Sequence, residues 1–250
     1  MIVRTEEVMG TVVSLHVVAP RLPALQVDVA LAAACAVLHR ADEVFSTWKP
    51  DSAMNRVRSG RLALEDAPEE IGVVLAICEE ARGLSGGWFD PWAMPGGLDP
   101  TGLVKGWAVE RALGTLRGAF AEAALVNAGG DVGGYGHPPG AEGWRVGIRH
   151  PWRPEGLAGI VKLEGAVATS GTYERGPHLI DPHDGLPRTA AASATVVGPS
   201  LAIADALATA LAVGGDNVLG QIAALGAYGA YLIRADGSEE TAGPIRFLTD

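Results

Sequence analysis

Residues 200–213 constrain the fold more than any other stretch of this chain. Their sequence, SLAIADALATALAV, is apolar on almost every side of a helix, so it predicts a helix that is buried all round. Ser200 follows Pro199 and is a favourable N-cap residue, and the glycine pair 214–215 provides a natural end. This helix therefore belongs in the interior of the fold.

Asp205 lies inside this apolar helix. A lone buried carboxylate is unfavourable, so it needs a partner or a proton, and it lies too far along to pair with the first N–H groups of its own helix. Thr209 follows four residues later on the same face. Two oxygen ligands on a dry face suit a hard cation such as Mg²⁺. A buried lysine or arginine partner is an equally good explanation at this point.

The remaining pattern predicts an α+β fold. Groups of strands and helices follow one another without a regular βαβ repeat, which favours a mixed β-sheet core with flanking helices. The length fits a single domain over residues 1–250, with room for two closely packed subdomains. The predicted helices are 24–44, 69–82, 104–117 and 200–213, and the predicted strands are 8–18, 123–130, 144–150, 159–165, 166–171, 193–197 and 227–235.

Charge and composition exclude several classes of protein. The chain has 19 Lys+Arg against 29 Asp+Glu, a net charge of −10, which excludes a general nucleic-acid binder. Its 48% hydrophobic residues are enough for a sizeable core. Cys35 and Cys78 lie in apolar stretches without metal-ligand spacing. The acidic start MIVRTEE resembles neither a signal peptide nor a lipobox, and Asp205 interrupts the best candidate membrane span, so we expect a cytoplasmic protein.

The segment FDPWAMPGGLDPTGLVKGWA contains a candidate phosphate site. Asp90 and Asp99 bracket a Pro/Gly-rich turn, and Thr101 and Gly102 lie at the entrance of a helix, where free N–H groups and the helix dipole favour a phosphate. Lys105, one turn later, can add a positive charge. Taken alone, such a segment is more often an ordinary helix cap with polar residues around it.

Two further segments carry polar residues. LVNAGGDVGGYG at 125–136 lacks the GxGxxG pattern and a following helix, so a simple turn between strands is favoured over an anion site. In HLIDPHDG, Pro182 breaks any helix that would align His178, Asp181 and His183 as metal ligands. A general base at His178, oriented by a neighbouring acid, is the better functional hypothesis.

These four segments, in this order, together with MGT at 9–11 and FSTWKPDS at 45–52, resemble the ApbE family of FAD:protein FMN transferases. The resemblance covers residues 9–210. It implies Mg²⁺-dependent cleavage of the FAD diphosphate, transfer of FMN to a threonine hydroxyl of an acceptor protein, and release of AMP. The acceptor motif implied is Asp-x-x-(Ser/Thr)-Gly-Ala-Thr.

The resemblance also implies roles for individual residues. His178 is the implied base for the acceptor threonine. Asp205 and Thr209 match the side-chain ligands of Mg²⁺, and Gly102 matches the residue that offers its backbone carbonyl. The positions implied to contact FAD are Met9, Trp48, Trp88, Phe89, Asp90, Asp99, Lys105 and Leu179.

The chain departs from the family pattern in places. Asp90 and Asp99 are only nine positions apart where the family often has a long insertion, Trp48 replaces the usual tyrosine, and Asn55 stands where a serine is usual. The family's export signal and lipid-anchored cysteine are not seen. Two alternatives stay open: an Mg²⁺-dependent FAD pyrophosphatase that yields FMN and AMP, and a non-catalytic FAD-binding protein.

Overall fold

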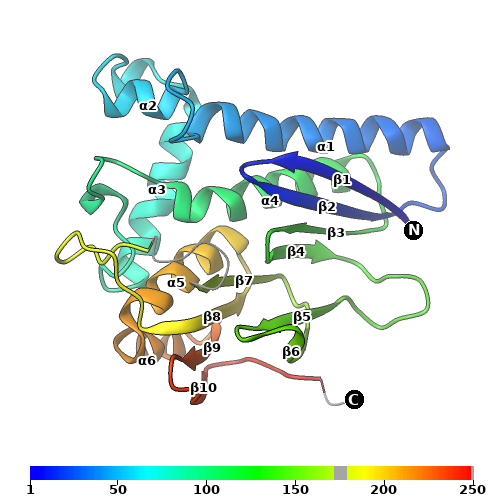
Figure 1. Cartoon of the computed structure of the whole chain (residues 1–250). Coiled ribbons are helices and arrows are strands. Elements are labelled where there is room, and N and C mark those ends of the chain that lie inside the picture. Colours follow the sequence, from blue (N-terminus) through cyan, green and yellow to red (C-terminus); the bar gives the residue numbers. More distant parts are fainter. Residues whose placement is uncertain (172–178, 249–250) are drawn as a thin grey trace.

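A large antiparallel sheet forms the centre of the computed structural model, which describes residues 1–171 and 179–248 (Figure 1). Its eight strands lie in the order β1-β2-β3-β4-β7-β8-β9-β10, and each neighbouring pair is antiparallel. The strands are β1 (Ile2–Val8), β2 (Thr11–Val18), β3 (Ala123–Ala128), β4 (Asp131–Tyr135), β7 (Ala166–Gly171), β8 (Ala191–Gly198), β9 (Gly229–Arg234) and β10 (Glu239–Ala242).

Helices cover one face of this sheet, so the predicted α+β class is confirmed. Helices α4 and α5 pack against the sheet and against each other, and α1 packs on α4 (Figure 1). The helices are α1 (Ala24–Phe45), α2 (Ala53–Arg58), α3 (Glu69–Leu84), α4 (Thr101–Gly118), α5 (Leu201–Gly214) and α6 (Asp216–Ala224), with short 3₁₀ helices at Leu64–Asp66 and Pro91–Ala93.

The opposite face of the sheet carries a second, smaller core beneath the hairpin of β5 (Arg145–His150) and β6 (Arg153–Lys162). Side chains of a strand alternate between the two faces. In β9, Leu232 belongs to the core under the helices, whereas Tyr231 and Ile233 belong to the core under the hairpin. Both faces of the central strands are therefore buried.

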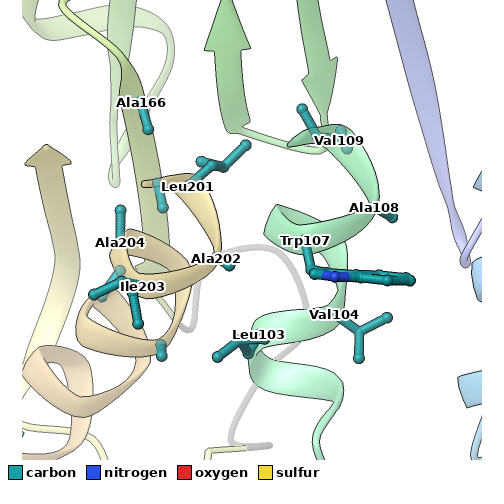
Figure 2. Close-up of a cluster of buried hydrophobic side chains, with 14 of the residues drawn as sticks. Leu103, Val104, Trp107, Ala108, Val109, Ala166, Leu201, Ala202, Ile203 and Ala204 are labelled. Atoms are coloured by element: carbon teal, nitrogen blue, oxygen red, sulfur yellow. The ribbon is translucent and has the colours of Figure 1, made fainter. Parts of the chain in front are cut away.

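Helix α5 is the buried helix that the sequence predicts. All of its residues are buried except Thr209, and the Ser200 side chain caps it by accepting a hydrogen bond from the N–H of Ile203 at 3.4 Å. Figure 2 shows how closely its first turn approaches α4. A Cβ atom on Gly106 would lie 2.5 Å from the carbonyl oxygen of Leu201, so only glycine permits this contact.

The structure differs from the prediction at several boundaries. A single strand over residues 8–18 is wrong, because β1 and β2 form a hairpin with a two-residue turn at Met9 and Gly10. Both turn residues have positive φ angles, 54° and 69°, as a type I′ turn requires. The prediction also missed α2, α6 and β10, and it named no strand over the residues of β4. These elements have only four to nine residues, so each offers few repeats of a helix or strand pattern.

Helix α1 is long and apolar enough to cross a membrane by length and composition alone. In the structure it lies along α4, and one of its faces contributes nine residues to the core. These buried residues are Val27, Ala30, Leu31, Ala34, Cys35, Leu38, Ala41, Val44 and Phe45.

Candidate functional site

A cavity of about 820 Å³ lies between the end of α1, the segment before α4, the start of α4 and the middle of α5. Its volume is typical of a site for a sizeable small molecule. It brings together every described residue for which the family resemblance implies a role in binding FAD or Mg²⁺. These are Met9, Trp48, Trp88, Phe89, Asp90, Asp99, Gly102, Lys105, Leu179, Asp205 and Thr209. His178, the predicted base, lies outside the described residues.

Two buried carboxylates flank one lysine at the deep end of the cavity, where Lys105 and Asp205 line the wall and Asp131 contacts Lys105 without lining the cavity. The Lys105 ammonium forms an ion pair with Asp131, and its Nζ lies 3.8 Å from Oδ1 of Asp205. The N–H of Gly106 donates to Oδ2 of Asp205 at 3.1 Å. Asp205 therefore has a lysine partner, one of the two explanations that the sequence left open.

One ammonium does not balance two carboxylates, and this affects the titration of Asp205. Burial and the negative charge of Asp131 raise the pKa of Asp205 to about 7, although Lys105 and the Gly106 N–H favour the ionised form. With both carboxylates ionised, the cluster carries a net negative charge in a place shielded from water. A bound cation would compensate that charge.

The oxygen atoms around Asp205 suit a hard divalent cation. Thr209 is the only residue of α5 that is not buried, and its Oγ1 lies 3.4 Å from Oγ of Ser170 on β7. A Cβ on Gly102 would lie 3.5 Å from the same Oγ1, so the backbone at Gly102 faces this hydroxyl. A carboxylate and a hydroxyl are oxygen donors that Mg²⁺ accepts.

The start of α4 opens into the same cavity. Oδ1 of Asp99 accepts hydrogen bonds from the N–H of Thr101 at 3.0 Å and from its Oγ1 at 2.6 Å. Thr101 and Gly102 form the first turn of α4 and line the cavity. An anion placed here would face the positive end of an 18-residue helix, with Lys105 one turn away.

The outer walls are mostly aromatic and apolar. Met9 comes from the β1–β2 turn, Phe89 is buried, and the side chain of Trp48 is 93% exposed. Asp90 lines the cavity, but its carboxylate is occupied by hydrogen bonds to other protein groups. Its carboxylate accepts from Nε of Arg82 at 2.8 Å and from the N–H of Trp92 at 2.9 Å, which caps a 3₁₀ helix.

The loop that carries Leu179 is held by a buried acid. Asp181 accepts hydrogen bonds from the N–H and Nδ1 of His183, at 2.9 and 2.8 Å, and pairs with Arg188 at 3.0 Å. Burial opposes ionisation, but these bonds and the Arg188 charge hold the pKa of Asp181 below its usual value. The His183 ring also lies 4.5 Å from the Trp88 ring. Asp181 and His183 thus fix a wall of the cavity.

Sequence reasoning missed Asp131, which holds Lys105 and accepts from the N–H of Thr169 at 3.4 Å. The segment 125–136 does form the predicted turn between two strands, with Asn127 accepting from the N–H of Gly130. The available signal was an acid directly after the turn in an otherwise apolar strand. Its partner was not visible, because Lys105 lies on a distant helix.

The comparisons with known proteins all point to the same family. A model of the ApbE family matches residues 9–97 and 93–231. Over 155 residues the chain is 38% identical to the FAD:protein FMN transferase of Rhodobacter capsulatus, covering 56% of this chain and 29% of that protein. The transferase of Klebsiella pneumoniae is 34% identical over 100 residues, covering 36% of this chain and 30% of that protein. The chain thus spans about a third of the length of the curated relatives it matches.

Solved structures show the same fold. The flavin transferase ApbE from Vibrio cholerae superposes with a TM-score of 0.83 at 20% identity, covering 96% of both chains. The ApbE protein from Thermotoga maritima superposes with a TM-score of 0.84 at 23% identity, again covering 96% of both chains. At these identities the likeness concerns the fold.

Proposed function

The chain belongs to the ApbE family, and from this premise we propose that it is an FAD:protein FMN transferase. It binds FAD in the cavity described above and transfers the FMN portion to a threonine hydroxyl of a second protein, releasing AMP. One observation carries the proposal: a single cavity joins an oxygen-rich, lysine-containing deep end to aromatic and apolar walls. A diphosphate suits the deep end, and the planar rings of FAD suit the walls.

Mg²⁺ fits the deep end, where Asp205, Thr209 and the Gly102 carbonyl would hold it. Bound there, it would neutralise negative charge on the diphosphate. The protein's own groups contribute independently of the metal. Lys105 supplies a fixed positive charge, held by Asp131, and the positive end of α4 favours an anion beside Thr101 and Gly102.

The transfer step needs a base for the acceptor hydroxyl. In our proposal His178 takes the proton of the threonine while the threonine oxygen forms a bond to the FMN phosphorus. The bond from this phosphorus to the bridging oxygen breaks, and AMP leaves with that oxygen. The acceptor is a protein with an Asp-x-x-(Ser/Thr)-Gly-Ala-Thr motif.

The test is a direct transfer assay. The protein is incubated with FAD, Mg²⁺ and a peptide that carries the acceptor motif. The products are then separated, and mass spectrometry identifies and quantifies them. Flavinylated peptide with an equal amount of AMP supports the proposal. Free FMN with AMP would indicate an FAD pyrophosphatase, and unchanged FAD would indicate a binding protein.

A matched pair of variants localises the activity. Asp205→Ala is expected to abolish Mg²⁺-dependent release of AMP, because it removes a carboxylate that lines the deep end. Asp28→Ala removes an exposed carboxylate on α1 and is expected to leave the rate unchanged. Normal AMP release by the Asp205 variant would contradict the assigned site.

A further inference from the structure

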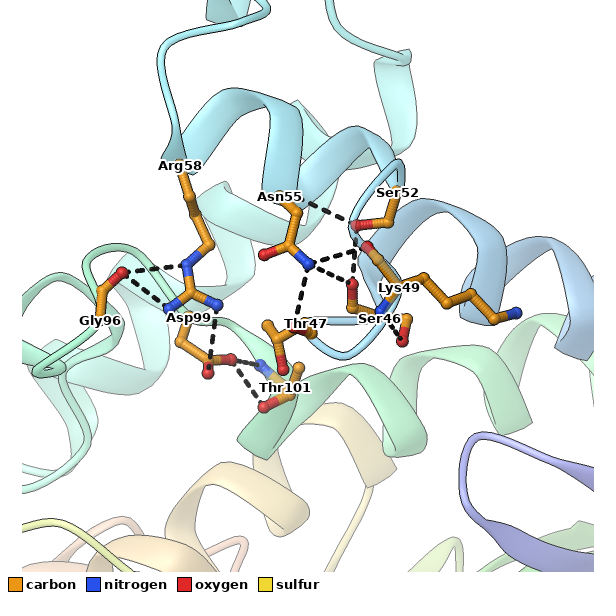
Figure 3. A network of polar contacts seen from close by, with 9 residues as sticks. All are labelled: Ser46, Thr47, Lys49, Ser52, Asn55, Arg58, Gly96, Asp99 and Thr101. Atoms are coloured by element: carbon orange, nitrogen blue, oxygen red, sulfur yellow. Dashed lines mark hydrogen bonds and ion pairs between the residues drawn. The ribbon is translucent and has the colours of Figure 1, made fainter.

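Two side chains of α2 hold the two loops at the mouth of the cavity. The first loop, residues 46–49, contains Trp48 and will be called the Trp48 loop. The second, residues 94–97, will be called the Gly96 loop. Both loops contribute lining residues to the cavity, and Figure 3 shows that polar contacts from α2 reach both of them.

Asn55 holds the Trp48 loop by its backbone. Its Nδ2 donates to the carbonyl oxygens of Ser46, Thr47 and Lys49, at 3.3, 2.9 and 2.8 Å. Ser52 adds a further bond to this loop, because its Oγ donates to the Ser46 carbonyl at 2.7 Å. These contacts fix the residues on both sides of Trp48. The indole is 93% exposed, so the backbone, and not packing of the ring, determines where Trp48 stands.

Arg58 holds the Gly96 loop from the same helix. Its Nε and a terminal nitrogen donate to the Gly96 carbonyl at 3.2 and 2.7 Å, and its guanidinium lies 3.9 Å from the Asp99 carboxylate. The side chain is only 15% exposed. Because Asp99 also binds Thr101 at the start of α4, Arg58 connects the Gly96 loop to the deep end of the cavity.

The spacing of the two residues makes them act together. Positions three apart lie on the same face of a helix, so Asn55 and Arg58 both project from the side of α2 that faces the cavity mouth. Helix α2 has only six residues, too few to be stable without tertiary contacts. Its orientation therefore depends on its tertiary contacts, which are these bonds together with the packing of the fully buried Met54.

We propose that Asn55 and Arg58 are positioning residues for FAD binding, a role that rests on the proposed function. They set the two loops before the ligand arrives, so that little conformational entropy is lost when a planar ring enters between them. Neither residue takes part in the chemical step. Their loss is expected to raise the KM for FAD and to leave kcat unchanged.

The test measures loop order and FAD affinity in the same variants. The protein is labelled with 5-fluorotryptophan, and the ¹⁹F signal of Trp48 is assigned by its loss in Trp48→Phe. In ligand-free Asn55→Ala the Trp48 signal should shift and sharpen as the loop becomes mobile. The FAD dissociation constant, measured from flavin fluorescence, should rise about tenfold in Asn55→Ala and in Arg58→Ala.

Control variants separate positioning from general destabilisation. Arg56→Ala removes an exposed arginine from the same helix and should change neither the Trp48 signal nor the FAD affinity. Asn55→Asp keeps the side-chain volume but replaces donors by acceptors facing three carbonyl oxygens, so it should weaken FAD binding at least as much as Asn55→Ala. Asn55→Ser keeps one donor and should lie between alanine and wild type.

Two results would overturn the proposal. One is an unchanged Trp48 signal in folded Asn55→Ala. The other is FAD affinity in Arg58→Ala and Asn55→Ala equal to that of Arg56→Ala. The ligand-free ¹⁹F measurement does not depend on the proposed function, so a wild-type protein that binds no FAD would contradict the transferase proposal without affecting the result for the loops.

Discussion

The two ends of the cavity are built in different ways. At the deep end, Asp205 and Gly106 are buried where α4 and α5 touch, and the two backbones are too close for a larger residue at Gly106. At the mouth, Trp48 is almost fully exposed and is held through bonds to backbone carbonyls. Changes at the deep end should therefore appear mainly as lost stability or lost catalysis, whereas changes at the mouth should appear mainly as weaker binding.

The largest expected effect on stability comes from Gly106→Ala. The added methyl group would lie 2.5 Å from the Leu201 carbonyl oxygen, so α4 and α5 must separate. We expect a loss of about 3 kcal/mol or more in the free energy of unfolding, measured by urea denaturation. Gly114→Ala is the matched control, because a methyl group there meets nothing within 4 Å. It should be neutral or stabilising by up to about 1 kcal/mol. If both variants changed the free energy of unfolding by the same amount, the close contact between α4 and α5 at Gly106 would be disproved.

The pKa of Asp205 predicts a dependence of stability on pH in metal-free protein. The folded protein retains this proton up to about pH 7, whereas the unfolded chain releases it near its ordinary pKa of 3.8. Unfolding releases the proton in this window, so the free energy of unfolding should fall as pH rises from about 4 to 7. We expect a loss of roughly 2–4 kcal/mol, which Asp205→Asn should lack.

The measurement is urea denaturation at pH 5 and pH 8 with a chelator present. Other carboxylates titrate in both proteins, so the informative quantity is the difference between wild type and Asp205→Asn at each pH. That difference should favour the variant at pH 8 and shrink at pH 5. A difference that does not change with pH would mean that Asp205 is already ionised at pH 5.

The contrast between the two ends also explains what sequence could predict. Asp205 and Thr209 could be predicted from the sequence, because a polar residue stands out in an apolar helix and the helical spacing of the two residues is local. The contact between Asp131 and Lys105 could not be predicted. It joins a strand to a helix that is distant in the sequence, so no sequence spacing indicates it. The roles of the site residues, as distinct from their positions, remain predictions.

The outer wall and the mouth were harder to predict, for a physical reason. Met9 occupies a turn position with φ of 54°, where asparagine or glycine is the usual residue and the sequence signal for a hairpin. Because methionine gives no such signal, the sequence predicted one strand over residues 8–18. In the same way, nothing in the sequence around Asn55 shows that its amide reaches three carbonyls of another loop. Such contacts follow from the path of the backbone, which local patterns do not determine.

Met9→Asn tests whether Met9 contributes to FAD affinity although its backbone conformation is unfavourable for the stability of the turn. The wild-type residue has an unfavourable backbone conformation, and asparagine followed by Gly10 suits a type I′ turn. Relief of strain should offset the lost contact of the partly buried Met9 side chain, so we expect the free energy of unfolding to change by less than about 1 kcal/mol. FAD affinity, measured by fluorescence titration, should fall. A large loss of stability would show that Met9 serves the core.

The smallest effect on stability is expected for Trp48→Ala, which removes a side chain that is 93% exposed. Its free energy of unfolding should lie within about 0.5 kcal/mol of wild type, because no packing is lost. Stacking of an aromatic side chain on a flat ring contributes about 1–3 kcal/mol, so FAD should bind at least five times more weakly, whereas Trp48→Phe should recover most of the affinity. Thermal denaturation and fluorescence titration measure the two quantities on the same samples. If Trp48→Ala instead unfolded more easily and bound FAD normally, the division between a packed deep end and a binding mouth would be wrong.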